Sequence, residues 1–397
     1  MMKCKRLGAL SLAIVLALSA LSGCGGQSPG STSGAGGSSG SSASGSGDSS
    51  QVEPMDLSQV TDPYLAVSGL PADEVVITVG DMEVAAADYL YWLNQVIGNY
   101  LSQFGGAMST LPWDVEMAEG LTFGQYMLDQ AADTAVLYSM LRQMAQAEGL
   151  STDSSGAIDE YADLVLQLDG DETRATHILW ANMLTRDLLT KLSENRDLYP
   201  RLQELYYGEN SGHYPTDAEV NAYLDEKGCF HVKHILLMTV DQATNEPLDE
   251  SEIAQKKATA DDLLAQLQAA EDPIALFDQL MNEYSEDGGL ATNPDGYVFD
   301  DTDSLVGGFR EATLALAVGE ISDVVETDYG YHIMLRLPID PADYRDEYVI
   351  DLLEARIDAE RDRLGVTRTA AFDKLDVESF WNNVLSLQSA VQAELAG

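Results

Sequence analysis

Two short apolar runs, each with a histidine inside it, constrain the fold of this chain more than any other feature. The first, Val-Lys-His-Ile-Leu-Leu at residues 232–237, contains His234, and the second, Tyr-Gly-Tyr-His-Ile at residues 329–333, contains His332. Their length and composition predict two buried strands. Between them lie a segment of helical periodicity, a loop rich in Gly and Asp, and a second apolar segment that ends at Leu316. The sequence therefore predicts a strand–helix–loop–helix–strand unit with a histidine on each terminal strand.

This order of elements, together with the end motifs His-Ile-Leu and Tyr-Gly-Tyr-His-Ile, resembles the parvulin family of peptidyl-prolyl isomerases. The resemblance covers residues 229–339, just over a quarter of the chain. It implies a parvulin domain, which is a small antiparallel-rich sheet flanked by helices. It also implies an enzyme that catalyses cis/trans isomerisation of X–Pro peptide bonds.

The resemblance assigns the polar residues of the site one by one. His234 and His332 correspond to the paired histidines of the parvulin active site. Thr327 corresponds to the hydroxyl residue that hydrogen-bonds the pair. Ser-Glu-Asp at residues 285–287 matches a loop whose third residue is cysteine in some parvulins and aspartate in many bacterial ones. Asp287 is therefore expected to be the polar partner of the twisting carbonyl.

The resemblance also identifies a proline pocket, with one departure from the family pattern. Leu305 and Phe309 stand where parvulins carry an apolar pocket residue and the aromatic wall. Ahead of the pocket helix, parvulins commonly have Gly-Asp-Leu-Gly-X-Phe, whereas residues 294–299 here read Pro-Asp-Gly-Tyr-Val-Phe. Gly296 takes the place of an apolar pocket residue. We therefore expect a shallower or differently shaped pocket, with Tyr297 as a candidate to fill it.

Isomerisation of an X–Pro bond makes modest chemical demands. Rotation breaks no covalent bond, but it must overcome amide resonance, with a barrier of about 18–20 kcal/mol. An enzyme needs only to favour the twisted amide, and lowering the barrier by about 4–7 kcal/mol speeds rotation roughly 10³–10⁵-fold. An apolar pocket for the proline ring and polar side chains around a desolvated carbonyl suffice. No nucleophile, metal or cofactor is expected.

Three residues at the start of the first predicted strand have a spacing that also occurs in metal sites. Cys229, His231 and His234 have the spacing C-x-H-x₂-H, which occurs in metal sites. Strand alternation, however, places Cys229 and His231 on one face and His234 on the other. His177 and His213 have no partner in sequence and are interpreted as ordinary surface or packing residues. The sequence predicts no metal site.

The N-terminus has the pattern of a targeting segment. A basic stretch at residues 3–6 precedes an apolar run at residues 7–20, which is short for a membrane span. Leu-Ser-Gly-Cys at residues 21–24 then looks like a lipobox. It predicts a lipoprotein signal peptide at residues 1–23 and lipidation of Cys24; the alternative is an ordinary signal peptide with an incidental cysteine. Residues 24–52 form a Gly/Ser tether, whose flexible part spans roughly 25–30 Å.

Net charge restricts the partners. Removing residues 1–23 takes away three basic residues and no acidic one, which leaves 18 basic against 66 acidic residues and a formal charge of −48. So acidic a chain argues against binding to nucleic acid or anionic lipid. The charge favours solubility and is compatible with basic clients. Only Cys229 remains in the mature chain besides Cys24, which excludes an internal disulfide framework.

The rest of the chain reads as helical. A strand is predicted at residues 75–79, followed by helices at about 85–101, 123–148, 156–168 and 174–194, and a short helix opened by a capping box at residues 216–219. Two C-terminal helices, at residues 344–364 and 377–395, cannot bury their apolar faces alone. We expect residues 343–397 to pack on the N-terminal part, residues 70–228, with the parvulin unit at 229–339 inserted between them. The predicted class is α+β.

This arrangement is similar to PrsA-type foldase lipoproteins and to periplasmic chaperones of the SurA kind. The similarity implies a foldase that is lipid-anchored to the extracytoplasmic face of the cell membrane. It would act on X–Pro bonds in unfolded or partly folded exported proteins. The alternative is a holdase chaperone with a weakly active or inactive parvulin domain. The sequence leaves open whether the protein is a monomer or a homodimer.

Overall fold

The computed structural model describes residues 53–103 and 111–397. The signal peptide, Cys24 and the tether predicted for residues 1–52 lie outside the described residues. The chain divides into two compact units. One unit is His213–Asp351, and the other combines the described residues up to Gly212 with Leu352–Gly397.

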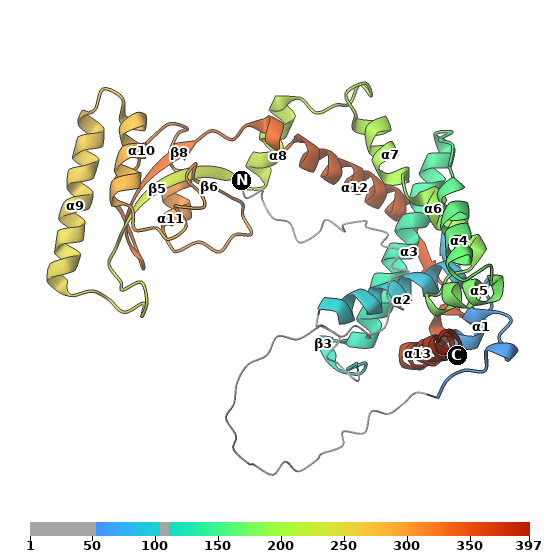
Figure 1. The fold of residues 1–397 in the computed structure, drawn as a ribbon. Coiled ribbons are helices and arrows are strands. Elements are labelled where there is room, and N and C mark those ends of the chain that lie inside the picture. The colour runs from blue at the N-terminus through green and yellow to red at the C-terminus, as the bar shows by residue number, and fades with distance from the viewer. Residues whose placement is uncertain (1–52, 104–110) are drawn as a thin grey trace, which may run out of the picture. The chain divides into compact units, whose positions relative to one another are not determined.

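The unit at His213–Asp351 contains a four-stranded antiparallel sheet in the order β6-β5-β8-β7 (Figure 1). His234 lies on β5 and His332 on β8, as predicted, and these two strands are neighbours. Leu236 is opposite His332 and His234 is opposite Met334 in their register. The strands are β5 (Phe230–Met238), β6 (Tyr297–Phe299), β7 (Val325–Thr327) and β8 (Gly330–Leu337).

Helices cover both faces of this sheet (Figure 1). α9 and α10 pack on the face that carries Ile235. α11 packs on the opposite face, where Phe309 belongs to one apolar cluster with Phe230 and Val232. Because side chains alternate along a strand, His234 shares the face of Val232. The bounds of these helices are α9 (Glu250–Ala269), α10 (Pro273–Tyr284) and α11 (Phe309–Leu314).

A capping box opens α8 (Asp217–Glu226), as the sequence predicted. The Thr216 hydroxyl accepts from the backbone N–H of Glu219, and the Glu219 carboxylate accepts from the backbone N–H of Thr216. Val220 of α8 then packs in one cluster with Tyr344, next to the 3₁₀ helix η3 (Pro341–Asp343). The elements on either side of the sheet in the chain thus meet each other within this unit.

The second unit is mainly helical. Two short sheets accompany its helices, one in the order β2-β1-β9 and one formed by β3 and β4. The strands are β1 (Val75–Val79), β2 (Met82–Ala85), β3 (Glu116–Ala118), β4 (Leu121–Thr122) and β9 (Val366–Arg368). The helices are η2 (Leu57–Gln59), α1 (Pro63–Ser68), α2 (Ala86–Gln103), α3 (Phe123–Ala147), α4 (Ser155–Gln167), α5 (Glu172–Ala181), α6 (Arg186–Asn195), α7 (Leu198–Tyr207), η4 (Phe372–Lys374) and α13 (Val377–Ala396), with the later part of α12 (Arg345–Leu364).

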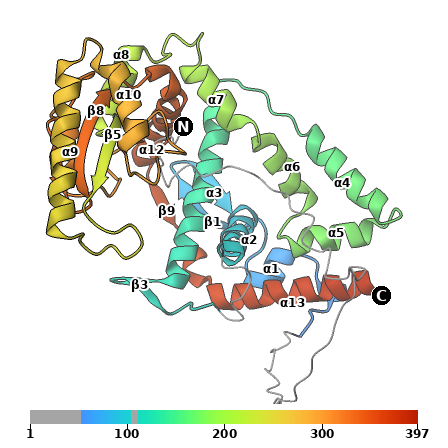
Figure 2. The same cartoon turned by 60° about the vertical axis from the view of Figure 1, so that its left-hand side comes forward.

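The N- and C-terminal segments of this unit share one core. β9 pairs antiparallel with β1, and α13 runs along α1 and α5 (Figure 2). Phe380 and Val384 of α13 are buried in the same cluster as Leu90 of α2. The Asn383 amide donates to the carbonyl of Val67 at 3.0 Å. α13 therefore buries its apolar face on N-terminal elements of this unit. Because the chain combines these helices with small antiparallel sheets, the predicted α+β class is confirmed.

The prediction of one helix over residues 174–194 is wrong, because the structure has α5 and α6 there. Asn182 ends α5 and Met183 adopts a left-handed φ of 56°. Thr185 then caps α6 by accepting from the N–H of Leu188 at 3.3 Å. A methionine in the left-handed region is uncommon, so nothing in the residue types signalled the break. α7 and β9 were also not predicted.

None of the helices in residues 53–103 and 111–397 is long and apolar enough to cross a bilayer.

Candidate active site

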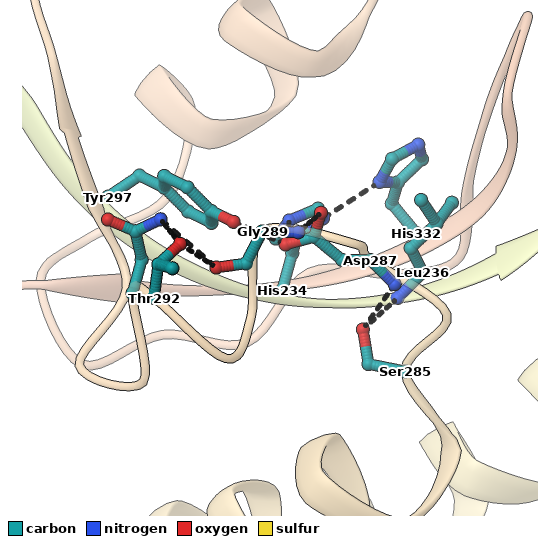
Figure 3. A network of polar contacts seen from close by, with 9 residues as sticks. His234, Leu236, Ser285, Asp287, Gly289, Thr292, Tyr297 and His332 are labelled. Carbon is teal, nitrogen blue, oxygen red and sulfur yellow. Dashed lines mark hydrogen bonds and ion pairs between the residues drawn. The ribbon is translucent and has the colours of Figure 1, made fainter. Parts of the chain in front are cut away.

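A chain of hydrogen-bonding side chains runs along the face of β5 and β8 (Figure 3). Thr327 Oγ1 lies 2.8 Å from His332 Nε2. His332 Nδ1 lies 3.1 Å from His234 Nδ1, and the two rings are nearly parallel, with centroids 5.3 Å apart. His234 Nε2 lies 3.3 Å from Asp287 Oδ2. The structure thus brings together all four polar residues that the sequence placed in the site.

The strand register explains how the two histidines meet. His332 pairs with Leu236 and not with His234, so the two rings are diagonal neighbours on one face of an antiparallel pair. Diagonal Cβ atoms are roughly 7–8 Å apart, which imidazole rings can span. Asp287 follows α10 on a loop held to β5, because the N–H of Leu236 donates to Ser285 Oγ at 3.1 Å.

The partners determine where the protons lie in this chain. A carboxylate only accepts, so His234 carries its proton on Nε2 and, when neutral, accepts at Nδ1. His332 must then donate from Nδ1 to His234. That leaves His332 Nε2 as an acceptor for the hydroxyl of Thr327. Each neutral imidazole thereby donates once and accepts once, and this tautomer assignment follows from the partners alone.

Electrostatics favour an ionised Asp287 carboxylate beside an uncharged His332. Burial raises the pKa of Asp287, but hydrogen bonds from His234, from the Tyr297 hydroxyl and from the Gly289 N–H outweigh it and hold that pKa well below its usual range. Burial lowers the pKa of His332 to about 3, and the charge on His234 acts in the same direction. The site therefore holds one negative charge on Asp287 and a neutral His332 at pH 7.

The two predicted pocket residues join one apolar cluster next to the histidines. The Phe309 ring is 4% exposed and meets the rings of His234 and His332 edge-on, both at 5.3 Å between centroids. Leu305 packs against the same cluster, which includes Val232. The Phe309 ring thus connects the histidine pair to the apolar cluster of this face of the sheet.

Comparison with known proteins agrees with this geometry. Residues 222–335 match the family of PPIC-type PPIase domains. The peptidyl-prolyl cis-trans isomerase Pin1 of Malus domestica is 39% identical over 85 residues, which cover 20% of this chain and 69% of that protein. The chain belongs to the parvulin family.

Other similar proteins are larger than the parvulin domain. The foldase protein PrsA of Geobacillus kaustophilus is 40% identical over 82 residues, which cover 21% of this chain and 28% of that protein. The chaperone SurA of Chromohalobacter salexigens is 26% identical over 195 residues, 48% of this chain and 39% of that protein. The aligned part therefore spans less than half the length of either relative.

Solved structures include the parvuline of Nitrosopumilus maritimus, with 25% identity and a TM-score of 0.19, covering 28% of this chain and 96% of that one. PrsA from Bacillus subtilis has 20% identity and a TM-score of 0.23, covering 64% of this chain and 90% of that one.

The departure from the parvulin motif has a clear structural basis. Gly296 has a φ of 93°, and a Cβ there would lie 2.6 Å from the carbonyl oxygen of Val232, so only glycine fits. Tyr297 follows on β6, and its ring stacks on Phe299 at 5.6 Å. Its hydroxyl donates to Asp287 at 2.5 Å, a contact that the sequence analysis missed. The available signal was the tyrosine itself, which replaces a glycine of the parvulin motif.

The remaining candidates lie apart from the parvulin site. His231 Nε2 lies 2.8 Å from the carbonyl oxygen of Asp295, on the opposite face of β5 from His234. Among the residues that the structure describes, no group of three or more His, Cys, Asp or Glu side chains could hold a metal ion. His177 is buried in the helical unit, where its Nδ1 lies 2.7 Å from Glu394.

Proposed function

We propose that this protein isomerises X–Pro peptide bonds in unfolded or partly folded exported proteins. The observation that carries the proposal is the hydrogen-bonded chain from Thr327 to Asp287 beside the buried ring of Phe309. The same set of residues provides an apolar surface for proline and a fixed charge for the peptide bond. The PPIC-type match over residues 222–335 supports it.

The charge on Asp287 acts on amide resonance. In the planar amide, resonance places negative charge on the carbonyl oxygen, and rotation removes part of it. A carboxylate next to that oxygen therefore raises the free energy of the planar form more than that of the twisted form. Since Asp287 accepts hydrogen bonds and is ionised, it works through its charge and not as a proton donor.

The histidine pair holds this charge in place. His234 lies between the two groups proposed to act on the substrate, because its ring meets the Phe309 ring and its Nε2 faces the Asp287 carboxylate. His332 and Thr327 fix the tautomer of His234 through one continuous series of hydrogen bonds. No proton has to move during rotation, so the pair acts by orientation and by excluding water from the carbonyl.

We also propose that residues 1–23 are removed and that Cys24 carries a lipid anchor on the extracytoplasmic face of the membrane. The lipobox sequence and the tether at residues 24–52 support this. Some relatives are named foldase protein PrsA, and this name is consistent with a protein that acts on unfolded substrates.

A proline-isomerisation assay on a short X–Pro peptide tests the proposed activity. We expect purified protein to accelerate isomerisation roughly 10³-fold or more over the spontaneous rate. His234→Ala should abolish most of this acceleration, whereas His213→Ala, an exposed histidine of the same unit outside the site, should not. Wild-type protein that leaves the spontaneous rate unchanged would refute the activity.

A holdase is the second candidate, and the glycine at position 296 favours it. Parvulins commonly carry an apolar pocket residue at this position, so the pocket lacks one of its usual side chains. A holdase would suppress aggregation of an unfolded client without accelerating X–Pro isomerisation. Running the aggregation and peptide assays on the same preparation therefore separates the two functions.

A further inference from the structure

We propose that Tyr297 is a positioning residue whose hydroxyl orients the Asp287 carboxylate for catalysis. The inference rests on the isomerase function proposed above and adds a residue that the parvulin motif does not predict. Asp287 Oδ2 receives the Tyr297 hydroxyl at 2.5 Å and also faces His234 Nε2 at 3.3 Å, while Oδ1 receives the N–H of Gly289 at 3.0 Å.

These contacts constrain the carboxylate from three directions. His234 comes from β5, Tyr297 from β6, and Gly289 from the loop that carries Asp287 itself (Figure 3). His234 and Gly289 alone would leave Oδ2 held by one long contact. The phenol adds a short charge-assisted hydrogen bond at that oxygen, and such bonds are about twice as strong as neutral ones.

The phenol is itself held in place. Its ring stacks on Phe299 with an angle of 9° and meets the edge of the His234 ring at 5.8 Å. Backbone pairing of Tyr297 with Val232 fixes where its side chain leaves β6. Gly296 allows this pairing, because any side chain there would meet β5.

Gly289 matches Tyr297 across the site. A Cβ at Gly289 would lie 2.2 Å from the Tyr297 hydroxyl oxygen, closer than two atoms can approach. The phenol thus lies directly over Gly289, and a side chain there would have to displace it. The loop at residues 285–289 and strand β6 therefore fit closely where the Tyr297 hydroxyl reaches Asp287.

The first test is Tyr297→Phe, which removes only the hydroxyl. We expect kcat to fall about tenfold to hundredfold and KM to change less than about threefold, because the bond acts on the charge and not on the proline surface. The Asp287 carboxyl titration, followed by ¹³C NMR, should move up by about one to two pH units. Tyr284→Phe, at an exposed tyrosine of the same unit, is the matched control and should leave both unchanged.

The second test is a pair of double-mutant cycles. In an Asp287→Ala background, Tyr297→Phe should cost nothing further, since the hydroxyl acts through Asp287. Gly289→Ala should displace the phenol and lower kcat as Tyr297→Phe does, but it should cost little in the Tyr297→Phe background. The inference is overturned if Tyr297→Phe lowers kcat as much in the Asp287→Ala background as in the wild-type protein. It is also overturned if Gly289→Ala lowers kcat equally in the wild-type protein and in the Tyr297→Phe background.

The outcomes separate the two proposals. If wild-type protein does not isomerise the peptide, the proposed function fails. If wild-type protein is active while Tyr297→Phe changes neither kcat nor the Asp287 titration, only the role of Tyr297 is refuted.

Discussion

In the proposed mechanism Phe309 and Asp287 act on different parts of an X–Pro substrate, so changing them one at a time distinguishes binding from catalysis. Phe309 provides apolar surface and touches both histidine rings. Asp287 provides a charge held by hydrogen bonds from two side chains and one backbone N–H. An enzyme that only bound proline would depend on the first residue and not on the second.

We therefore expect Phe309→Ala to raise KM and lower kcat/KM by about tenfold, and Asp287→Ala to lower kcat by about 10²-fold with a small change in KM. Steady-state kinetics on an X–Pro peptide provide the measurement. Because truncating a buried Phe costs about 3–5 kcal/mol of stability, Phe309→Leu serves as a better-folded variant with the same direction of effect. Activity that survives the loss of both side chains would contradict this division.

The titration of His332 predicts a pH dependence of stability. The pKa of His332 is lowered to about 3 in the folded protein, so between pH 6.5 and 3 the unfolded chain binds a proton that the folded one does not. The contribution of His332 to the free energy of unfolding is therefore fully present above pH 6.5. It decreases as the pH falls, by about 1.4 kcal/mol per pH unit at most. Asp287, whose folded pKa is also lowered, adds a loss of the same sign below its ordinary value of 3.8.

Urea denaturation at pH values from 4 to 8, monitored by circular dichroism, checks this prediction. His332→Gln should reduce the change in the free energy of unfolding with pH between pH 6.5 and 4, because it removes the titrating group. A wild-type stability that rises as the pH falls through this range would contradict the assignment.

At single positions, motif reasoning predicted which polar side chains lie together but not all of their contacts. His234, Asp287, Thr327 and His332 stand in recognisable motifs, and the strand register brings them together. The hydroxyl contact of Tyr297 could not be predicted, because it depends on the turn at Gly296 and on the rotamer of a side chain that replaces glycine. Pairwise distances of this kind arise from packing across the sheet.

At the level of elements, periodicity and capping predicted most long helices. The capping box at Thr216 and the apolar periodicity of α2, α3 and α13 correspond to elements that the structure contains. The errors lie where elements are short. β9 has three exposed residues and no alternation to read, and the left-handed Met183 divides α5 from α6. Tertiary contacts decide such positions.

The packing of α13 makes a prediction at this scale. Phe380, Val384 and Leu387 of α13 are buried in the core of the helical unit. We expect a chain that ends at residue 376 to lose the cooperative unfolding transition of this unit, while residues 213–351, produced alone, should give a folded α/β domain. Thermal melts of the two proteins, with the full described chain as control, provide the measurement.

Two results would contradict this view. One is a cooperative melt of the helical unit in the chain that ends at residue 376. The other is an unfolded spectrum for residues 213–351, since a compact unit with its own core should fold independently.

For the whole molecule, the lipid anchor proposed at Cys24 leads to a prediction about where the protein is located. Cys24→Ser should prevent lipid attachment, so the protein should remain an uncleaved precursor or appear in the soluble fraction. Fractionation of cells, with metabolic labelling by a radioactive fatty acid, provides the measurement. Cys229→Ser, at the cysteine inside the folded region, should keep the label. Normal processing and membrane association of the Cys24→Ser protein would refute the anchor.

The pairing of β1 with β9 determines the order in which this chain can acquire structure during synthesis. The Thr369 hydroxyl donates to the carbonyl of Val75, 294 residues earlier, and β9 completes the sheet that β1 begins. A contact of such sequence separation forms late, because a long loop must close first. Residues 213–351 are all synthesised before β9. The isomerase unit can therefore fold while the helical unit still lacks its last strand. A chain that ends at residue 365 should therefore have a protease-resistant sheet around His234 and His332 and a protease-sensitive N-terminal part.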